Sequence, residues 1–487
     1  MRIQYNFSKI QVAAALMIAV AFVFVYYALT VGPFSNLLFD ISSVFVVVLV
    51  FLFFNQSQKG EMKGFWIKPS YFFILGFWAV NLQFLTDVRL GLKGVDSERI
   101  IYPTILNHCL ALAVVGLAAF VAGYISVKGI IHKREDSLHS KMPGKSKLLS
   151  VIQLIVFALF VYNIDLVSFL SGADYGIAEH NLANYFESLL YVCNAVIVVY
   201  AIKNNNISNL RSYFKAIPAL SLMVIILYIL MRMMSGDRGP FIYTTLLLIF
   251  GYLYAVKRKV KLVYIFSFAL AAMLFVSVIG IARSLDRSDT FLSRMIYGYD
   301  TYRTEGRFGS DSRTVFGLTE ELGFSFVVNQ VDVNAVVCED AKYHYGTYQL
   351  ITIANSIPFM PGFIANVLHV KPEDRGSSGF ANYHFFHGYD RTWGIGTTCL
   401  GDFYLDLGVL GVLLGFLLAG ILFKCLDLSI ITSDSKKMSI YEVLFILLFS
   451  AKSIYIPRSV LLIDLQGFVL GFLLLLFNNM MMKGAKN

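Results

Sequence analysis

Apolar runs of about 20 residues recur from one end of this 487-residue chain to the other. A helix of that length crosses roughly 30 Å of hydrocarbon, and a helix satisfies its own backbone hydrogen bonds where no water is available. Charged residues make up only 15% of the chain, against about 25% in soluble domains. These features predict an all-α polytopic membrane protein.

Twelve spans are predicted, and the basic loops between them indicate their orientation. The loops at 59–68, 128–147 and 257–261 follow the second, fourth and eighth spans and are rich in lysine. Such loops mark the cytoplasmic side, so both termini are predicted to lie in the cytoplasm. The predicted spans are 10–30, 37–54, 69–86, 104–126, 148–169, 183–202, 216–234, 240–255, 262–282, 398–423, 440–456 and 460–478.

One loop is far longer than the others. Residues 283–397 form a segment of 115 residues that faces outward in this topology, too long for an idle connection. Within it, the apolar stretch 348–370 is broken by prolines and is predicted to lie along the membrane surface or against the helix bundle. The chain is thus predicted to be a single transmembrane domain, 1–487, with the loop 283–397 inserted between spans nine and ten.

The stretch MRMMSGDRGPFIYTT, residues 231–245, places Asp237 and Arg238 at a Gly-Pro bend between spans seven and eight. In the predicted topology this bend faces outward. Pro240 suits the first turn of a helix, and Asp237 would lie near the positive end of that helix. Two interpretations stay open: a capped turn with an arginine that reaches the interface, or a ligand-binding pair.

Lysine and arginine differ in the side of the membrane on which they are predicted to lie. In this topology 19 of the 23 lysines are cytoplasmic, whereas 13 of the 17 arginines lie in spans or outside. The planar guanidinium binds phosphate oxygens two at a time and stays charged in poor solvent, so outward arginines predict a lipid that carries phosphate. Some of them must instead pair with the 13 acids of the long loop. The candidates for phosphate binding are Arg238, Arg283, Arg287, Arg375, Arg391 and Arg458.

A second group of functional side chains lies in HFFHGYDRTWGIGTTCLGDFYLDLG, residues 384–408. His384, His387 and Asp390 are of the types that serve as general acids and bases. Asp402 lies at the start of span ten, and an acid so close to hydrocarbon favours a functional role. An alternative interpretation of each histidine is a structural role, as a partly buried side chain that forms hydrogen bonds. The spacing of two histidines alone does not predict a metal site.

Several classes of chemistry have no support in the sequence. The five cysteines form no C-x-x-C pair and no G-x-x-x-x-G-K-[ST] motif is present, so neither a metal or redox cofactor nor ATP is expected. The net charge of +9 is explained by cytoplasmic loops and does not require a nucleic-acid partner. Cys338 and Cys399 could both lie outside the cytoplasm, as a disulfide or as two free thiols.

The layout and motifs resemble the bacterial O-antigen and oligosaccharide repeat-unit polymerases, the Wzy class. The resemblance rests on about twelve spans with one dominant loop, on the Asp237-Arg238-Gly239 hinge, and on the segment YHYGTYQLITIANSIPFMP at 343–361. It also rests on a Gly394-Ile395-Gly396-Thr397 run that leads to Asp402, Tyr404 and Gly408. In that family the acid before the tyrosine is more often glutamate.

The resemblance implies a GT-C-like glycosyltransferase of the bacterial inner membrane. It implies transfer of a glycan from one undecaprenyl diphosphate to the sugar of another undecaprenyl-diphosphate-linked repeat unit, on the periplasmic face and without nucleotide sugars. Arg238, Arg458 and the Arg283/Arg287 pair would then bind the diphosphate, with Asp237 orienting Arg238. The general base would be His387, His384, Asp390 or Asp402, in that order. A chain-length regulator is a possible partner.

Three alternatives remain. A lipid-linked oligosaccharide flippase also handles phosphate lipids, but should place its charges within the spans and have short loops; the few charges predicted within the spans (Asp40, Arg232 and Asp165) and the long loop favour an enzyme. An O-antigen ligase shares donor, side and fold class. A purely structural membrane protein would not require outward arginines at lipid depth.

Overall fold

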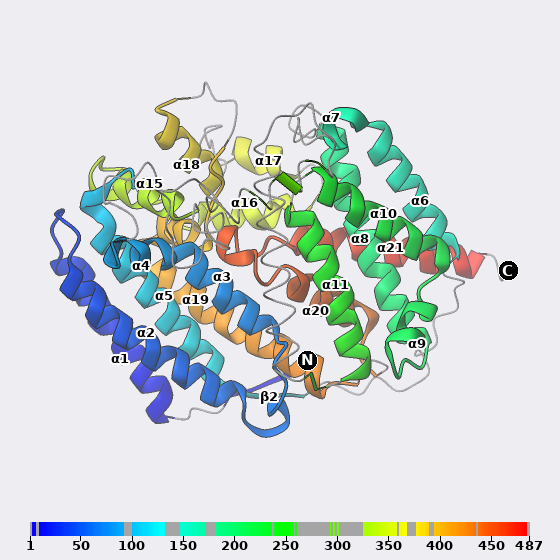
Figure 1. Cartoon of the computed structure of the whole chain (residues 1–487), viewed down its shortest axis with the longest axis horizontal. Helices are drawn as coiled ribbons and strands as arrows, with labels where there is room; N and C mark the ends of the chain where they lie inside the picture. Colours follow the sequence, from blue (N-terminus) through cyan, green and yellow to red (C-terminus); the bar gives the residue numbers. More distant parts are fainter. Residues whose placement is uncertain are drawn as a thin grey trace. The chain divides into compact units, whose positions relative to one another are not determined.

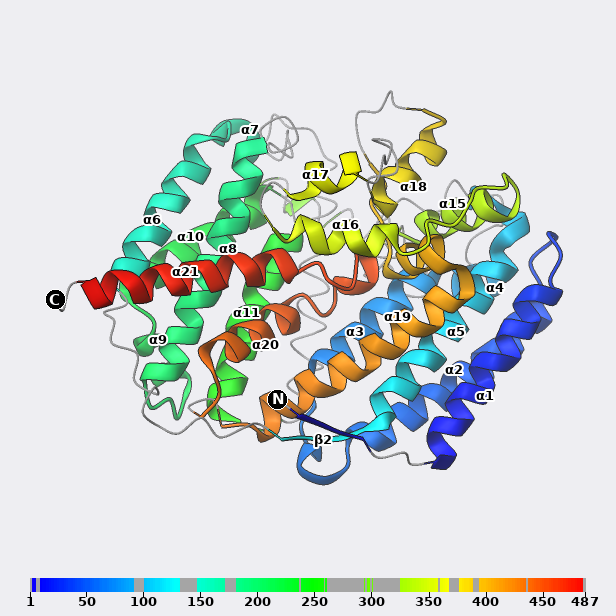
Figure 2. The same ribbon diagram turned by 180° about the vertical axis from the view of Figure 1, so that it is seen from behind.

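The chain is described by a computed structural model, shown in Figure 1 and, from behind, in Figure 2. It forms two compact units. Unit 1 comprises Met1–Ile131, Asp311–Leu428 and Ser453–Ile463, and unit 2 comprises the remainder. The residues described are 2–5, 9–91, 100–131, 147–170, 181–235, 238–257, 259–260, 293, 296–297, 300, 325–357, 360–367, 376–388, 394–434 and 437–484.

Unit 1 is built around one fully buried helix, α5 (Leu106–Ser126). The first two helices, α1 (Lys9–Ala28) and α2 (Asn36–Ser57), pack against it and run beside it in both views (Figures 1 and 2). These two helices keep many large apolar side chains exposed, as expected of helices that face lipid. The Ser35 hydroxyl accepts a hydrogen bond from the Leu38 N–H at 3.2 Å, which caps the start of α2.

The rest of unit 1 connects this bundle to the long loop. After the 3-10 turn η1 (Gly60–Met62), α3 (Pro69–Asn81) and α4 (Gln83–Arg89) meet at a 48° bend. Two short strands, β1 (Arg2–Tyr5) and β2 (Val127–Ile131), pair antiparallel with Gln4 opposite Gly129. The loop contributes α15 (Phe326–Val337), α16 (Thr347–Asn355), α17 (Met360–Val367) and α18 (Ser377–Phe386). Helix α15 packs against α18 and α5.

Helix α19 (Cys399–Thr432) is interrupted at Leu407 and Gly408, where Gly408 has a φ of 62°. Its long second part crosses α5 very closely. A side chain on Gly123 would overlap the carbonyl oxygen of Leu417, and one on Gly420 would overlap that of Phe120. Small residues at such crossings let two backbones approach in a membrane, where packing rather than the hydrophobic effect drives association.

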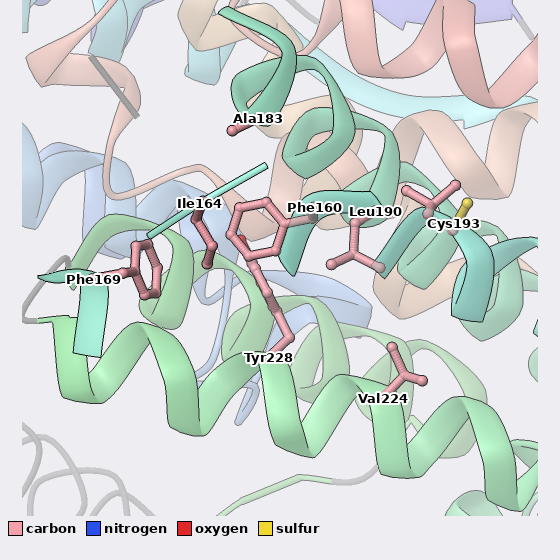
Figure 3. Close-up of a cluster of buried hydrophobic side chains, with 9 residues drawn as sticks. Phe160, Ile164, Phe169, Ala183, Leu190, Cys193, Val224 and Tyr228 are labelled. Carbon is pink, nitrogen blue, oxygen red and sulfur yellow. The ribbon is translucent and has the colours of Figure 1, made fainter. Parts of the chain in front are cut away.

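Unit 2 consists of apolar helices with a paired charge in their core. They are α6 (Lys147–Tyr162), α7 (Leu166–Leu170), α8 (Asn181–Asn204), α9 (Leu210–Ala216), α10 (Ala219–Ser235), α11 (Arg238–Val256), α20 (Ile440–Ala451) and α21 (Leu465–Gly484). Figure 3 shows part of the core, where Phe160, Phe169 and Tyr228 meet. Next to it, Arg232 pairs with Glu187, whose Oε1 accepts from the Tyr228 hydroxyl at 2.5 Å.

The predicted spans correspond to helices wherever the structure describes them; only 262–282 lies outside the described residues. Among the described residues, six helices are long and apolar enough to cross a membrane, or eight if each bent pair forms one span. The all-α polytopic class is thereby confirmed, whereas the number of twelve crossings stays a prediction. Where the structure describes the apolar stretch 348–370, it contains the short helices α16 and α17.

Candidate active site

The start of α19 is fixed by a chain of buried polar groups. The Thr398 hydroxyl oxygen accepts a hydrogen bond from the Gly401 N–H at 2.9 Å, which caps the helix. The same hydroxyl donates to Oδ1 of Asn329 in α15 at 2.5 Å, and Asn329 donates to Asn81 at the end of α3 at 2.8 Å. Gly396, just before the cap, has a φ of 81°, which is open mainly to glycine. The Gly-x-Gly-x-Thr run is therefore the turn that places α19.

Asp402 joins two loop helices to α19. Its Oδ1 accepts from the Ser377 hydroxyl at the start of α18 at 2.7 Å. Its Oδ2 accepts from Nε2 of Gln349 in α16 at 2.5 Å. The side chain is 1% exposed, and a buried carboxylate of this kind needs such partners. Figure 2 shows α16 and α18 meeting α19 at this end.

Asp406, one turn further along α19, holds the start of α16. Its two carboxylate oxygens accept from the backbone N–H groups of Tyr348 and Gln349, each at 3.0 Å. These N–H groups belong to the first turn of α16, where helix donors have no partner within the helix and a negative charge is favoured by the helix dipole. Asp402 and Asp406 thus fasten the long loop to the membrane helix from one face.

Tyr404 and Gly408 complete the motif that the sequence singled out. The Tyr404 hydroxyl hydrogen bonds to that of Tyr26 in α1 at 2.6 Å, and its ring meets that of Tyr343 edge-on, with centroids 5.9 Å apart. A Cβ on Gly408 would lie 3.0 Å from Cζ of Tyr343. Glycine is therefore required at 408 by its positive φ and by the space that Tyr343 occupies.

Asp332 is a third carboxyl group at this site. It is wholly buried in α15, and neither of its oxygens has a hydrogen-bond partner among the described residues. Burial raises the pKa of Asp332 well above its usual range, and the nearby charge of Asp402 raises it further. Burial and a second negative charge nearby both favour the protonated form of a carboxyl group.

His384 forms a histidine–carboxylate pair at the surface of the loop helices. Its Nδ1 lies 2.9 Å from Oε2 of Glu339, and the other oxygen, Oε1, accepts from Nδ2 of Asn334 at 2.8 Å. The ring packs against Phe380, with centroids 4.3 Å apart. A carboxylate on Nδ1 fixes the tautomer and orientation of an imidazole and leaves Nε2 for a substrate. The His384 side chain is 20% exposed.

The other predicted site residues fall in different places. His387 is exposed and ends α18 in the left-handed conformation, with a φ of 52°. Arg458 is half-buried in the 3-10 turn η6 (Ile456–Arg458) of unit 1. The backbone of Leu461, three residues later, lies against the Cys399 thiol at the start of α19. The structure therefore brings the Arg458 segment to the end of α19 that carries Asp402.

Arg238 is the first residue of α11 in unit 2, and Pro240 lies in the first turn of that helix as predicted. The remaining candidates, Asp237, Arg283, Arg287, Arg375, Asp390 and Arg391, lie outside the described residues. Among the cysteines, Cys338 is exposed and Cys399 is buried, and both are free. The part of the chain that the structure describes holds no group of three or more potential metal ligands.

The sequence did not single out Glu339, Asn334, Gln349 or Asp332. Glu339 was one of 13 acids in the loop, and only the fold reveals that it faces a histidine 45 residues later. Gln349 lies within the segment 343–361 that carried the resemblance. Asp332 lies in the run FVVNQVDVNAVV, where one acid in an apolar helix was the available signal.

Comparison with curated proteins and with solved structures finds no match. The family model described as O-antigen polysaccharide polymerase Wzy matches residues 12–484, nearly the whole chain. This agrees with the apolar helices of a multi-pass membrane protein. The chain therefore belongs to the Wzy family of O-antigen polysaccharide polymerases, polymerising enzymes of the inner membrane.

Proposed function

We propose that this polymerase joins undecaprenyl-diphosphate-linked repeat units on the periplasmic face of the membrane, and that His384 is its general base. The observation that carries the assignment of the base is the His384–Glu339 pair, in which Nδ1 and Oε2 are 2.9 Å apart. This pair lies on the loop that the positive-inside rule places outside the cytoplasm. Both termini would then be cytoplasmic, and the fold GT-C-like, as the resemblance implies.

In the proposed reaction, a hydroxyl oxygen of the acceptor sugar attacks the anomeric carbon of the donor glycan. A new glycosidic bond forms while the bond from that carbon to the diphosphate oxygen breaks, and the bonding electrons leave with the lipid diphosphate. The acceptor proton passes to Nε2 of His384, and the Glu339 carboxylate stabilises the resulting imidazolium. The proton is later returned to the departing diphosphate or to water.

The leaving diphosphate needs positive charge. In this proposal Arg458 supplies it from unit 1, because its turn adjoins the start of α19 beside Asp402. Arg238, Arg283, Arg287, Arg375 and Arg391 stay candidates for the same role, with Asp237 orienting Arg238. Guanidinium groups placed where charge develops lower the barrier by electrostatic stabilisation. His387, Asp390 and Asp402 remain alternative bases, although both oxygens of Asp402 already accept hydrogen bonds.

The test is complementation of a strain that lacks its own copy of the gene, with lipopolysaccharide separated on a gel. His384→Ala should leave single repeat units on the lipid A core and reduce longer chains by about 10²–10⁴-fold, the usual contribution of a general base. The amount of protein in the membrane must equal that of the wild type. If His384→Ala polymerises normally while His387→Ala does not, the base is His387 and our assignment is wrong.

The same gel separates the polymerase from its rivals. A ligase or flippase defect removes even the single unit from the lipid A core, whereas a polymerase defect keeps it. Arg458→Lys and Arg458→Ala both test the diphosphate role, because lysine keeps the charge but loses the planar fork. Full activity with lysine would show that two-point phosphate binding by Arg458 is not needed.

A further inference from the structure

A second group of buried charges lies in unit 1 near the other end of α19. Lys424 is 3% exposed, and Lys68 and Asp427 are wholly buried. Lys424 is 16 residues beyond Gly408, about 24 Å along a helix that rises 1.5 Å per residue. The group is therefore separate from the candidate active site around Asp402.

Asp427 is engaged by neutral groups rather than by the lysines. Its Oδ1 accepts from the Ser70 N–H at 3.2 Å. Its Oδ2 accepts from the Ser70 hydroxyl at 2.5 Å and from the Tyr124 hydroxyl at 2.7 Å. Lys68, just before α3, donates from Nζ to the carbonyl oxygen of Ser57. Among the described residues, one carboxylate thus faces two ammonium groups without a close ion pair to either.

Lys424 has the poorest partners of the group. Its Nζ lies 4.6 Å from the centre of the Tyr124 ring and 3.9 Å from Sδ of Met62. A thioether sulfur is a weak acceptor, and an ammonium group has three donors. The negative charge of Asp427 attracts it, and the positive charges of Lys68 and Lys59 oppose this attraction. A buried cation is costly unless it is paired, so this position has the charge and the free donors of an anion site.

Met62 covers Lys424 from the 3-10 turn η1. It belongs to η1, between α2 and α3, and is flanked by Gly60 with a φ of 59° and Gly64 with a φ of 82°. Met62 is buried, whereas Lys59 and Lys63 of the same turn are exposed. A methionine side chain is unbranched and adaptable, so its withdrawal would open Lys424 towards Lys59.

We propose that Lys424, Lys68 and Lys59 form a binding site for a phosphate group at the cytoplasmic surface of the membrane, with Met62 as its displaceable cover. The lysine-rich loop 59–68 places this end of unit 1 in the cytoplasm by the positive-inside rule. Two sources offer the same phosphate oxygens: the head group of an anionic lipid in that leaflet, where such lipids give a negative surface potential, or free inorganic phosphate.

The test uses the full-length protein purified in an uncharged detergent. Bound lipid is counted by native mass spectrometry, and thermal unfolding is followed with phosphatidylcholine, with phosphatidylglycerol, or with inorganic phosphate. The variants are K424M, which replaces the ammonium group by an apolar side chain suited to burial, and the matched control K63M, an exposed lysine of the same turn. Thermal unfolding without ligand establishes that each variant folds.

We expect the wild type and K63M to retain phosphatidylglycerol and to gain thermal stability from it. K424M should bind it at least about tenfold more weakly, the loss of one hydrogen bond to a charged group. Stabilisation by phosphate but not by phosphatidylglycerol identifies free phosphate as the ligand. Equal binding by K424M and the wild type, or no binding of either ligand by the wild type, overturns the proposal.

Discussion

A side chain on Gly401 would overlap Oδ2 of Asp332, because the first turn of α19 lies directly against α15 at this point. Replacing a helical glycine by alanine usually stabilises a helix by about 0.5–1 kcal/mol. Here the added Cβ would meet the carboxyl group of a wholly buried residue, so we expect Gly401→Ala to lower the thermal stability of the purified protein by about 1–3 kcal/mol.

Gly467→Ala in α21 is the matched control. A Cβ at Gly467 has its nearest neighbour, Cγ2 of Val192, at 3.7 Å, an ordinary packing distance. We expect this variant to unfold at or above the wild-type temperature. A second variant, Gly401→Ala with Asp332→Ala, removes the overlapping carboxyl group and should recover part of the lost stability. No recovery would mean that the close approach to Asp332 is not the cause.

The His384–Glu339 pair predicts a positioning role for Glu339. Glu339→Gln keeps the size of the side chain but removes the charge that holds Nδ1 of His384 and stabilises the imidazolium. We expect polymer formation to fall by about tenfold or more while single units on the lipid A core remain.

Asp340→Asn is the control for this variant, since it removes the same charge at an exposed neighbour. Asp340 has a φ of 54°, which asparagine also tolerates. Both variants are compared by gel analysis at equal amounts of membrane protein. If Asp340→Asn is as defective as Glu339→Gln, the effect comes from the charge of the loop and not from the pair.

We expect the carboxylate of Asp406 to stabilise the start of α16. Asp406→Asn removes the charge that accepts from the Tyr348 and Gln349 N–H groups. We expect a cost of about 1–2 kcal/mol, as for the loss of a helix cap, and faster hydrogen exchange across 347–355. Asp40→Asn breaks an exposed pair with Arg89 and should have little effect on stability, because solvent screens such a pair. Unchanged exchange in α16 would contradict the capping role.

The buried amine of Lys68 predicts a stability that depends on pH. Burial lowers the pKa of Lys68 to about 8, from a usual value of about 10.4. Between these two values the unfolded chain keeps a proton that the folded chain has released, so the free energy of unfolding should rise with pH. This pH dependence is measured by thermal unfolding in uncharged detergent without anionic lipid, from about pH 8 to about pH 10.

Lys68→Met should reduce the slope of this pH dependence, because methionine carries no titrating group. Lys63→Met should keep the wild-type slope, since Lys63 is exposed. A wild-type slope in Lys68→Met would mean that another group titrates in this window.

Hydropathy located the helices well, but it did not show where they break. The predicted span 69–86 is two helices, α3 and α4, with a 48° bend, and the break falls beside Asn81, whose side chain donates to the Phe77 carbonyl oxygen and accepts from Asn329. The predicted span 148–169 ends as α6 at Tyr162 and resumes as α7. The partner of Asn81 comes from a distant segment, and an average of hydropathy over neighbouring residues does not contain that information.

By itself the sequence determined the membrane class, the position of most helices and the family, because the length of apolar runs and the spacing of short motifs are local properties. Tertiary structure alone decided that Glu339 faces His384, that Asp402 and Asp406 hold α16 and α18, and that Lys424 is buried beside Met62. The physical reason is that a hydrogen bond requires two groups within about 3 Å of each other. Only the packing of helices brings residues as far apart as 349 and 402 to that distance.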